Sequence, residues 1–147
     1  ALAETAVLEG TTRTLSAQSR QRAREQVEET VKGIAAVYGG KAQEIWDNIA
    51  SALVNDPVAS AEVAEMVTVQ ESDLTVKMDR PLSLGGDNFS EFQLEVPGIY
   101  AYLGTADPQK PETQVPIHNG RFQMDEDALP IGAWLYAACA RHWLGCL

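Results

Sequence analysis

The strongest constraint on the fold is a helical repeat of apolar residues that runs from Ser16 to the glycine pair Gly39-Gly40. Arginines and glutamates occupy the intervening positions, as on an amphipathic helix. Ser16 has the side chain of a good N-cap, and a glycine at position 39 can end the helix. The apolar positions are Ala23, Val27, Val31, Ile34, Ala35 and Tyr38. The spacing therefore predicts one long helix over residues 16–38.

Two segments with the composition of β-strands flank this helix. Residues 5–14 alternate polar and β-branched or apolar side chains, and residues 41–49 contain Ile45, Trp46 and Ile49. Two strands joined by a helix form a β-α-β unit, whose right-handed crossover places the helix on one face of a small sheet. The order predicts a first α/β module over residues 1–50.

A second α/β module is predicted over residues 51–147. Asp56 and Pro57 suit the start of a helix that carries an apolar face of valines and Met66. Strand patterns follow at residues 74–78 and 98–104. A closing helix then begins with the acidic stretch Asp125, Glu126 and Asp127, which favours a helix N-terminus through the macrodipole.

Composition excludes several classes of function. The net charge of −10 argues against a nucleic-acid binder, which needs clustered Lys and Arg. The longest apolar run, near residues 131–140, is too short to cross a bilayer, and no export signal is visible at the start. Two cysteines in 147 residues do not make a disulfide scaffold, so we expect a cytoplasmic protein. The abrupt start in a strand pattern predicts a segment of a longer polypeptide.

Most candidate clusters have a simpler structural explanation. Cys139, His142 and Cys146 share a helix face, but that face continues the apolar stripe of a core helix, so we reject a metal site there. Arg13 lies on the same strand face as Glu9 and could hold a substrate carboxylate, although a solvated face explains it better. His118 lies in a Pro- and Gly-bounded loop, where a surface role competes with a ligand role. No nucleophile with its base is present.

Two loops carry a resemblance to a known family. The segment "LSLGGDNFSEFQLEVPGIYAYLGT" resembles the glycine motif of the aminoacylase-like zinc peptidases and amidohydrolases, and "PIHNGRFQMDEDALPIGAWLYAACA" resembles their C-terminal segment. Upstream, "AVLEGTTRTLSAQSRQRAREQVEETVKGIAAVYGG" is similar to the second half of the family's lid domain, and "VNDP" to the return into the catalytic domain. Hippurate hydrolase, N-acyl-amino-acid amidohydrolase and the indole-acetyl-amino-acid hydrolases form the most similar branch.

The resemblance implies an α/β fold in two parts. Residues 1–50 would form the second half of a lid or dimerisation domain, a β-α-β unit with an antiparallel sheet and helices on one face. Residues 51–147 would form the C-terminal α/β part of a zinc-peptidase-like catalytic domain. Such a hydrolase cleaves the amide of an N-acyl amino acid or small peptide with water activated by two divalent metal ions, zinc by expectation and manganese or cobalt as alternatives.

The resemblance also implies roles for individual residues. His118 matches the last metal ligand, and Asn119 is its neighbour. Asn119, Arg13 and five loop residues would line the site or bind substrate, the five being Gly85, Gly86, Asp87, Asn88 and Phe89. The family has Glu-Asp where this chain has Asp87-Asn88, so one negative charge is lost.

The family's other metal ligands and its glutamate base find no counterpart in these 147 residues. We therefore expect the C-terminal portion of a metallopeptidase or amidohydrolase that is inactive alone. Its partners would be the N-terminal part of the same enzyme, a second copy bound through the lid, and a small substrate, with no nucleic acid and no membrane. The alternative is a non-catalytic α/β association module that recruits partner strands at an exposed sheet edge.

Overall fold

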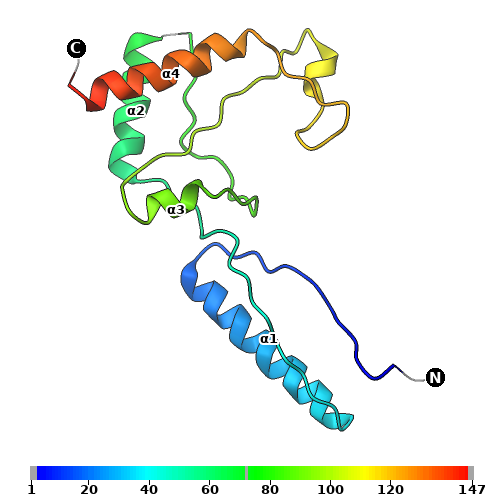
Figure 1. The fold of residues 1–147 in the computed structure, drawn as a ribbon. Helices are drawn as coiled ribbons and strands as arrows, with labels where there is room; N and C mark the ends of the chain where they lie inside the picture. The colour runs from blue at the N-terminus through cyan, green and yellow to red at the C-terminus, as the bar shows by residue number, and fades with distance from the viewer. Residues whose placement is uncertain (1–2, 72, 146–147) are drawn as a thin grey trace. The chain divides into compact units, whose positions relative to one another are not determined.

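The computed structural model describes residues 3–71 and 73–145, and its elements are helical (Figure 1). The elements are α1 (Ala17–Val37), α2 (Pro57–Gln70), α3 (Phe89–Gln93), the 3-10 helix η1 (Pro111–Gln114) and α4 (Ala128–Trp143). The chain divides into two compact units. The first unit comprises Ala1–Asp56 with Met78–Ile99, and the second comprises Pro57–Lys77 with Tyr100–Leu147.

The predicted antiparallel sheet is wrong: the described residues contain no strand. Residues 5–14 and 41–49 are extended, but neither segment makes a backbone-to-backbone hydrogen bond in the described part of the chain. Extended backbone becomes a sheet only when a neighbouring strand accepts and donates its hydrogen bonds. Residues 74–78 and 98–104, also predicted as strands, are likewise not strands here. The proposed domain boundary at residue 50 stays a prediction.

Helix α1 forms where the apolar repeat predicts it. The Ser16 Oγ accepts a hydrogen bond from the Ser19 N–H at 3.0 Å, which satisfies one free donor of the first turn. At the other end Gly39 has a φ of 72°, the left-handed conformation that glycine adopts without strain. The apolar side of α1 is not covered in this structure, since Ile34 is 59% exposed.

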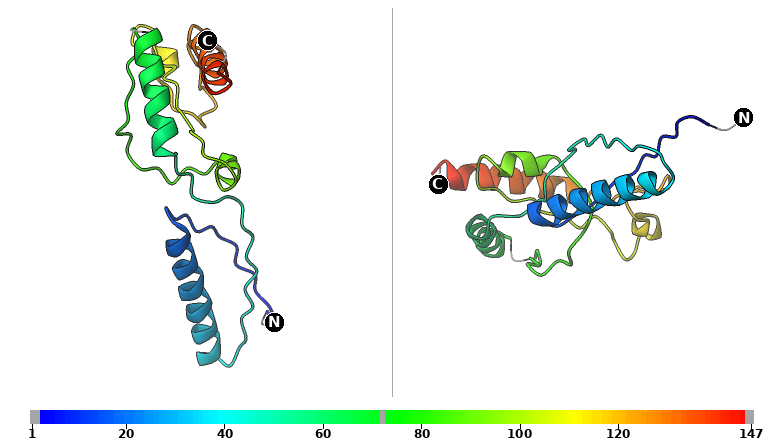
Figure 2. Two further views of the ribbon diagram at one scale, coloured as in Figure 1. Left: turned by 90° about the vertical axis from the view of Figure 1, so that its left-hand side faces the viewer. Right: turned by 90° about the horizontal axis from the view of Figure 1, so that it is seen from below.

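Residues 41–50 run back along α1, antiparallel to it (Figure 2). Lys32 pairs with Glu44 at 3.7 Å, the Arg24 guanidinium lies over the Trp46 ring, and Arg20 donates to Asn48. As the residue number rises along the extended segment, the partner on α1 lies closer to the N-terminus of the helix. Alternate side chains of the segment therefore face the helix, so the period of two in the sequence is real although no sheet forms.

The second unit holds most of the buried apolar side chains. Helix α2 buries Ala59, Val63, Met66 and Val67, and α4 buries Ala128 and Ala138. Glu62 of α2 contacts two residues of α4: its Oε2 accepts from the Trp143 Nε1 at 3.0 Å and lies 3.8 Å from the His142 Nε2. Both helices were predicted from apolar spacing and are confirmed, although α4 begins at Ala128, after the three acids. No helix in the described ranges combines the length and the apolar character that a bilayer crossing needs.

Candidate functional site

The double glycine lies in the first unit beside Arg13. The Arg13 Nη1 donates to the Leu84 carbonyl at 3.3 Å, and a Cβ added to Gly86 would lie 3.6 Å from that same nitrogen. The Gly85 N–H donates to the Ser83 Oγ at 3.1 Å. Neither Gly85 nor Gly86 has a positive φ, so the backbone does not require glycine at either position. The structure thus brings together Arg13 and the glycine pair, two parts of the predicted site.

Asp87 uses its oxygens to begin α3. Its Oδ1 accepts a hydrogen bond from the Phe89 N–H at 2.8 Å, and its backbone carbonyl accepts one from the Ser90 Oγ at 3.0 Å. Ser90 is only 1% exposed. A carboxylate at the start of a helix satisfies free N–H groups and faces the positive end of the helix dipole. The Asp87 carboxylate is therefore committed to local structure, whereas Asn88 remains exposed.

Phe89 closes this loop onto its own C-terminal end. Its ring lies so close to Gly98 that a Cβ added there would be 3.4 Å from the Phe89 Cζ. The Gln93 side chain donates to the Gly98 carbonyl at 3.0 Å, and the Asp56 N–H donates to the same carbonyl at 3.0 Å. Gly98 is thus one position in the loop where a side chain would meet an aromatic ring. Phe89 acts here as a packing residue.

Sequence reasoning missed the role of Glu91. The spacing Asn88-Phe-Ser-Glu91 is that of a capping box, yet Asn88 makes no side-chain cap bond. Glu91 instead accepts a hydrogen bond from the Ser51 N–H at 2.7 Å. Hydrogen bonding to Ser51, from the side chain and then the backbone, lowers the pKa of the Glu91 carboxyl. Glu91 therefore attaches α3 to the segment that follows residue 50, a long-range contact with no local signal in the sequence.

His118 lies in the second unit and is held in an uncommon backbone conformation. Its φ is 69°, and it is the non-glycine residue with a positive φ among those the structure describes. It occupies the third position of a turn in which the Asn119 N–H donates to the Pro116 carbonyl at 3.3 Å. The Asn119 Oδ1 accepts from the Arg121 N–H at 2.9 Å. The turn leaves His118 exposed, with no hydrogen-bond or charge partner for its ring in the described residues.

A positive φ at a non-glycine residue costs roughly 1–2 kcal/mol, although His tolerates it better than most residues do. Residues held in such a conformation cluster at functional sites, because the surrounding structure must maintain the strain. The conformation was not visible from the sequence, which showed only a histidine between a proline and an Asn-Gly pair. It is an independent reason to single out His118.

No group of three or more His, Cys, Asp or Glu side chains able to hold a metal ion occurs in the described ranges. A zinc site needs three or four such ligands. A metal site that included His118 would therefore need its other ligands from outside the described residues. On α4, burial raises the pKa of the Cys139 thiol, which disfavours the thiolate that metals bind. Cys146, the third member of that rejected cluster, lies outside the described residues.

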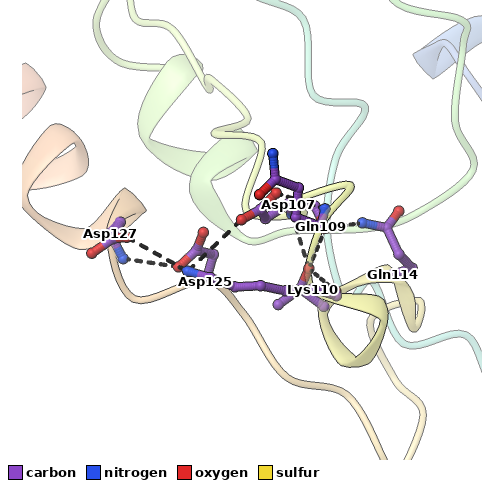
Figure 3. Close-up of polar contacts among 7 residues, drawn as sticks. Asp107, Gln109, Lys110, Gln114, Asp125 and Asp127 are labelled. Atoms are coloured by element: carbon purple, nitrogen blue, oxygen red, sulfur yellow. Dashed lines mark hydrogen bonds and ion pairs between the residues drawn. The ribbon is translucent and has the colours of Figure 1, made fainter.

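Two of the three acids before α4, Asp125 and Asp127, lie with Asp107 around a lysine that sequence reasoning overlooked. Figure 3 shows Lys110 among these acids. Its Nζ lies 2.7 Å from the Asp125 Oδ1, 3.5 Å from the Asp127 Oδ2 and 3.8 Å from the Asp107 Oδ2. The Lys110 hydrogen bond lowers the pKa of the Asp125 carboxyl, and Asp125 raises the pKa of Lys110 in return. The acids thus bind an ammonium in addition to preceding a helix. The spacing Asp107-x-x-Lys110 was the available signal.

Comparison with known proteins gives relatives across nearly the whole chain. This chain is 32% identical over 136 residues to thermostable carboxypeptidase 2 of Saccharolobus solfataricus, and 30% identical over 138 residues to N-acetylcysteine deacetylase of Bacillus subtilis. It is 29% identical over 133 residues to N-acetyldiaminopimelate deacetylase of Enterococcus faecalis. These alignments cover 92%, 92% and 89% of this chain but only 33% of each relative.

The chain therefore spans about a third of the length of the curated relatives it matches. No family model matches the sequence. No solved structure matches it either. The resemblance predicted from the two loops is nonetheless confirmed. Over 92% of its length the chain is a relative of the carboxypeptidases and N-acyl deacetylases of the amidohydrolase family.

Proposed function

We propose that this chain is the C-terminal portion of a metal-dependent amidohydrolase or carboxypeptidase that cleaves the amide bond of N-acyl amino acids or small peptides. The named relatives are a carboxypeptidase and two deacetylases, all hydrolases of amide bonds. The single observation that supports a site in this chain is His118, exposed and held at a φ of 69° in the loop of the second resembling motif.

His118 supplies one metal ligand in this proposal. A neutral imidazole binds zinc through either ring nitrogen, and manganese or cobalt are alternatives. Metal ions at such a site activate a water molecule and polarise the carbonyl of the substrate. The remaining ligands and the general base come from the rest of an enzyme of the relatives' length, so the 147-residue chain alone is inactive.

Arg13 is the candidate for substrate recognition. Its guanidinium carries five N–H donors in a planar fork, and the described hydrogen bond to the Leu84 carbonyl uses one nitrogen. An exposed guanidinium beside Gly86 can bind a carboxylate by donating two parallel hydrogen bonds, and the glycine leaves space for the carboxylate. We propose that this pair binds the carboxylate of the N-acyl amino acid, while Asn88 of the same unit contacts the remaining polar groups.

A second proposal concerns association. Residues 5–14 and 41–49 are extended and lack backbone hydrogen bonds in the described structure, and Val7, Leu8, Ile45 and Ile49 are each more than 80% exposed. Such a segment accepts a partner strand readily. We propose that residues 1–50 associate with a second copy or with the N-terminal part of the enzyme. A purely non-catalytic association module is the alternative.

The test uses a polypeptide of the relatives' length that contains this chain. His118→Ala should release at least one bound metal ion and lower hydrolysis of N-acyl amino acids by more than about 100-fold. Removing a residue that only orients a metal ligand lowers activity by at most about 100-fold, so a larger loss indicates a ligand. His142→Ala is the matched control, a histidine of the same unit on α4. Unchanged metal content and activity in His118→Ala would refute the ligand assignment.

Oligomeric state separates the two proposals. Sedimentation of the 147-residue chain should show self-association, and replacing Ile45 and Ile49 by Lys should abolish it, because charge on an edge opposes strand pairing. An enzyme that hydrolyses amides only in the longer form, with self-association through residues 1–50, satisfies both proposals. A chain that self-associates while the longer polypeptide neither binds metal nor hydrolyses amides leaves the association module alone.

A further inference from the structure

The loop that carries His118, residues 115–124, is shaped by its own turns. The Asn119 N–H donates to the Pro116 carbonyl, the Phe122 N–H donates to the Asn119 carbonyl at 2.9 Å, and the Arg121 N–H donates to the Asn119 side chain. Every hydrogen bond described for residues 115–124 stays inside the segment. These bonds set the conformation of the His118 loop. Where the loop lies in its unit is decided at its two ends.

The upstream end is attached to the turn at residues 107–110. Thr113 is 5% exposed, and its Oγ1 accepts from the Asp107 N–H at 2.9 Å and donates to the Lys110 carbonyl at 2.8 Å. The Gln114 Nε2 donates to the Asp107 carbonyl at 2.6 Å. A buried hydroxyl with both donor and acceptor roles satisfied holds this end rigidly against the turn.

The downstream end returns to the same turn. The Asp125 N–H donates to the Thr105 carbonyl at 2.9 Å, and the Lys110 Nζ donates to the Asp125 Oδ1 at 2.7 Å. Lys110 and Asp125 are 15 residues apart in sequence, with the whole His118 loop between them. The Lys110 side chain therefore closes the loop from one end to the other (Figure 3).

We propose that Lys110 is a positioning residue for His118: by binding Asp125, with Asp127 and Asp107 around it, it holds the two ends of the His118 loop together. The inference rests on the proposed function of His118 as a metal ligand. Lys110 touches neither the metal nor the substrate. Lys110 keeps the loop in the conformation that metal binding by His118 requires. The free energy of metal binding is then not reduced by the cost of ordering the loop.

The charges make the effect larger than the loss of one hydrogen bond. Asp107, Asp125 and Asp127 all lie within 4 Å of one ammonium, which balances their mutual repulsion. Without that ammonium, the carboxylate of the turn and those before α4 repel each other, and only the hydrogen bond from the Asp125 N–H to the Thr105 carbonyl is described as holding the downstream end of the loop. The pKa of Lys110 is raised and that of Asp125 is lowered, so both groups stay charged throughout the neutral range.

The first test measures order in the 147-residue chain by NMR. Lys110→Ala should lower the backbone order parameters of residues 116–122 from about 0.85 to below about 0.6. Lys110→Arg should preserve them, and so should the exchanged pair Lys110→Asp with Asp125→Lys. Lys77→Ala is the matched control, an exposed lysine of the same unit. Unchanged order parameters in a folded Lys110→Ala chain would overturn the inference.

The second test measures zinc affinity by calorimetry in the polypeptide of the relatives' length. Lys110→Ala should weaken zinc binding by about fivefold, which corresponds to a binding-competent loop in about one molecule in five. Lys110→Arg should restore the affinity. If His118→Ala leaves zinc binding unchanged, His118 is not a metal ligand and the proposed function fails. The order parameters still test whether Lys110 orders the His118 loop. If His118→Ala weakens zinc binding and Lys110→Ala does not, the positioning role is wrong.

Discussion

The backbone conformation of His118 makes a prediction whose sign can be tested at a single position. In the left-handed region an L side chain costs roughly 1–2 kcal/mol, whereas glycine adopts the region without steric cost. Glycine loses more chain entropy on folding, by about 0.5–1 kcal/mol relative to alanine. The steric term is the larger of the two here. His118→Gly should therefore be more stable than His118→Ala by about 1 kcal/mol.

The matched control is the preceding residue. Ile117 is 70% exposed and does not have a positive φ, so only the entropy term applies there. Ile117→Ala should be more stable than Ile117→Gly by about 0.5–1 kcal/mol. The order of the Ala and Gly variants should thus reverse between two neighbouring positions of one turn. Both variants at one position lose the native side-chain contacts. That loss therefore cancels when the free energies of unfolding of the Ala and Gly variants are compared.

Urea unfolding is the assay. The second unit contains Trp134 and Trp143, so a Trp46→Phe background restricts the tryptophan signal to that unit. With a slope of about 2 kcal/mol per molar urea, a difference of about 1 kcal/mol moves the midpoint by about 0.5 M. Equal slopes are required, so that the shift reports stability alone. If His118→Ala is as stable as His118→Gly, the backbone of residue 118 is not strained and the inference from it fails.

Two further outcomes follow from burial and charge. Met66→Ala, at a side chain that is 6% exposed, should lower the free energy of unfolding by about 2–5 kcal/mol, whereas Val69→Ala, at a side chain that is 76% exposed, should change it by no more than about 0.5 kcal/mol; equal effects would contradict the placement of α2. The first unit should lose stability in acid, because Glu91 has a pKa lowered from 4.5 by hydrogen bonding to Ser51. A lowered carboxyl pKa contributes stability that is fully present above the unfolded value and is lost as pH falls through the folded one, so the loss should begin below about pH 4.5 and be reduced in Glu91→Gln. Urea midpoints between pH 6 and pH 3 measure the loss, read from Trp46 in a Trp134→Phe, Trp143→Phe background. An unaltered pH profile in Glu91→Gln would exclude Glu91 as the cause.

The helices were the part of the fold that could be predicted, because their signals are local. Ser16, the apolar repeat of α1 and the Gly39-Gly40 pair lie within one stretch of chain, and so do Asp56, Pro57 and the apolar face of α2. The sheet could not be predicted in the same way. The period of two at residues 41–50 was real, but its half-buried residues face α1. Alternation shows that one side of a segment is covered and does not show what covers it.

The same distinction between local signals and long-range contacts applies to the candidate site. The sequence by itself determined the family, through two loop motifs in order, and it singled out His118, Arg13 and the glycine pair. Only the tertiary structure decided that Arg13 lies beside Gly86, that Asp87 begins α3, and that Lys110 closes the His118 loop onto Asp125. It also decided the left-handed conformation of His118. Motifs are read from neighbouring residues, whereas these contacts join residues up to 71 positions apart and exist only once the chain has folded.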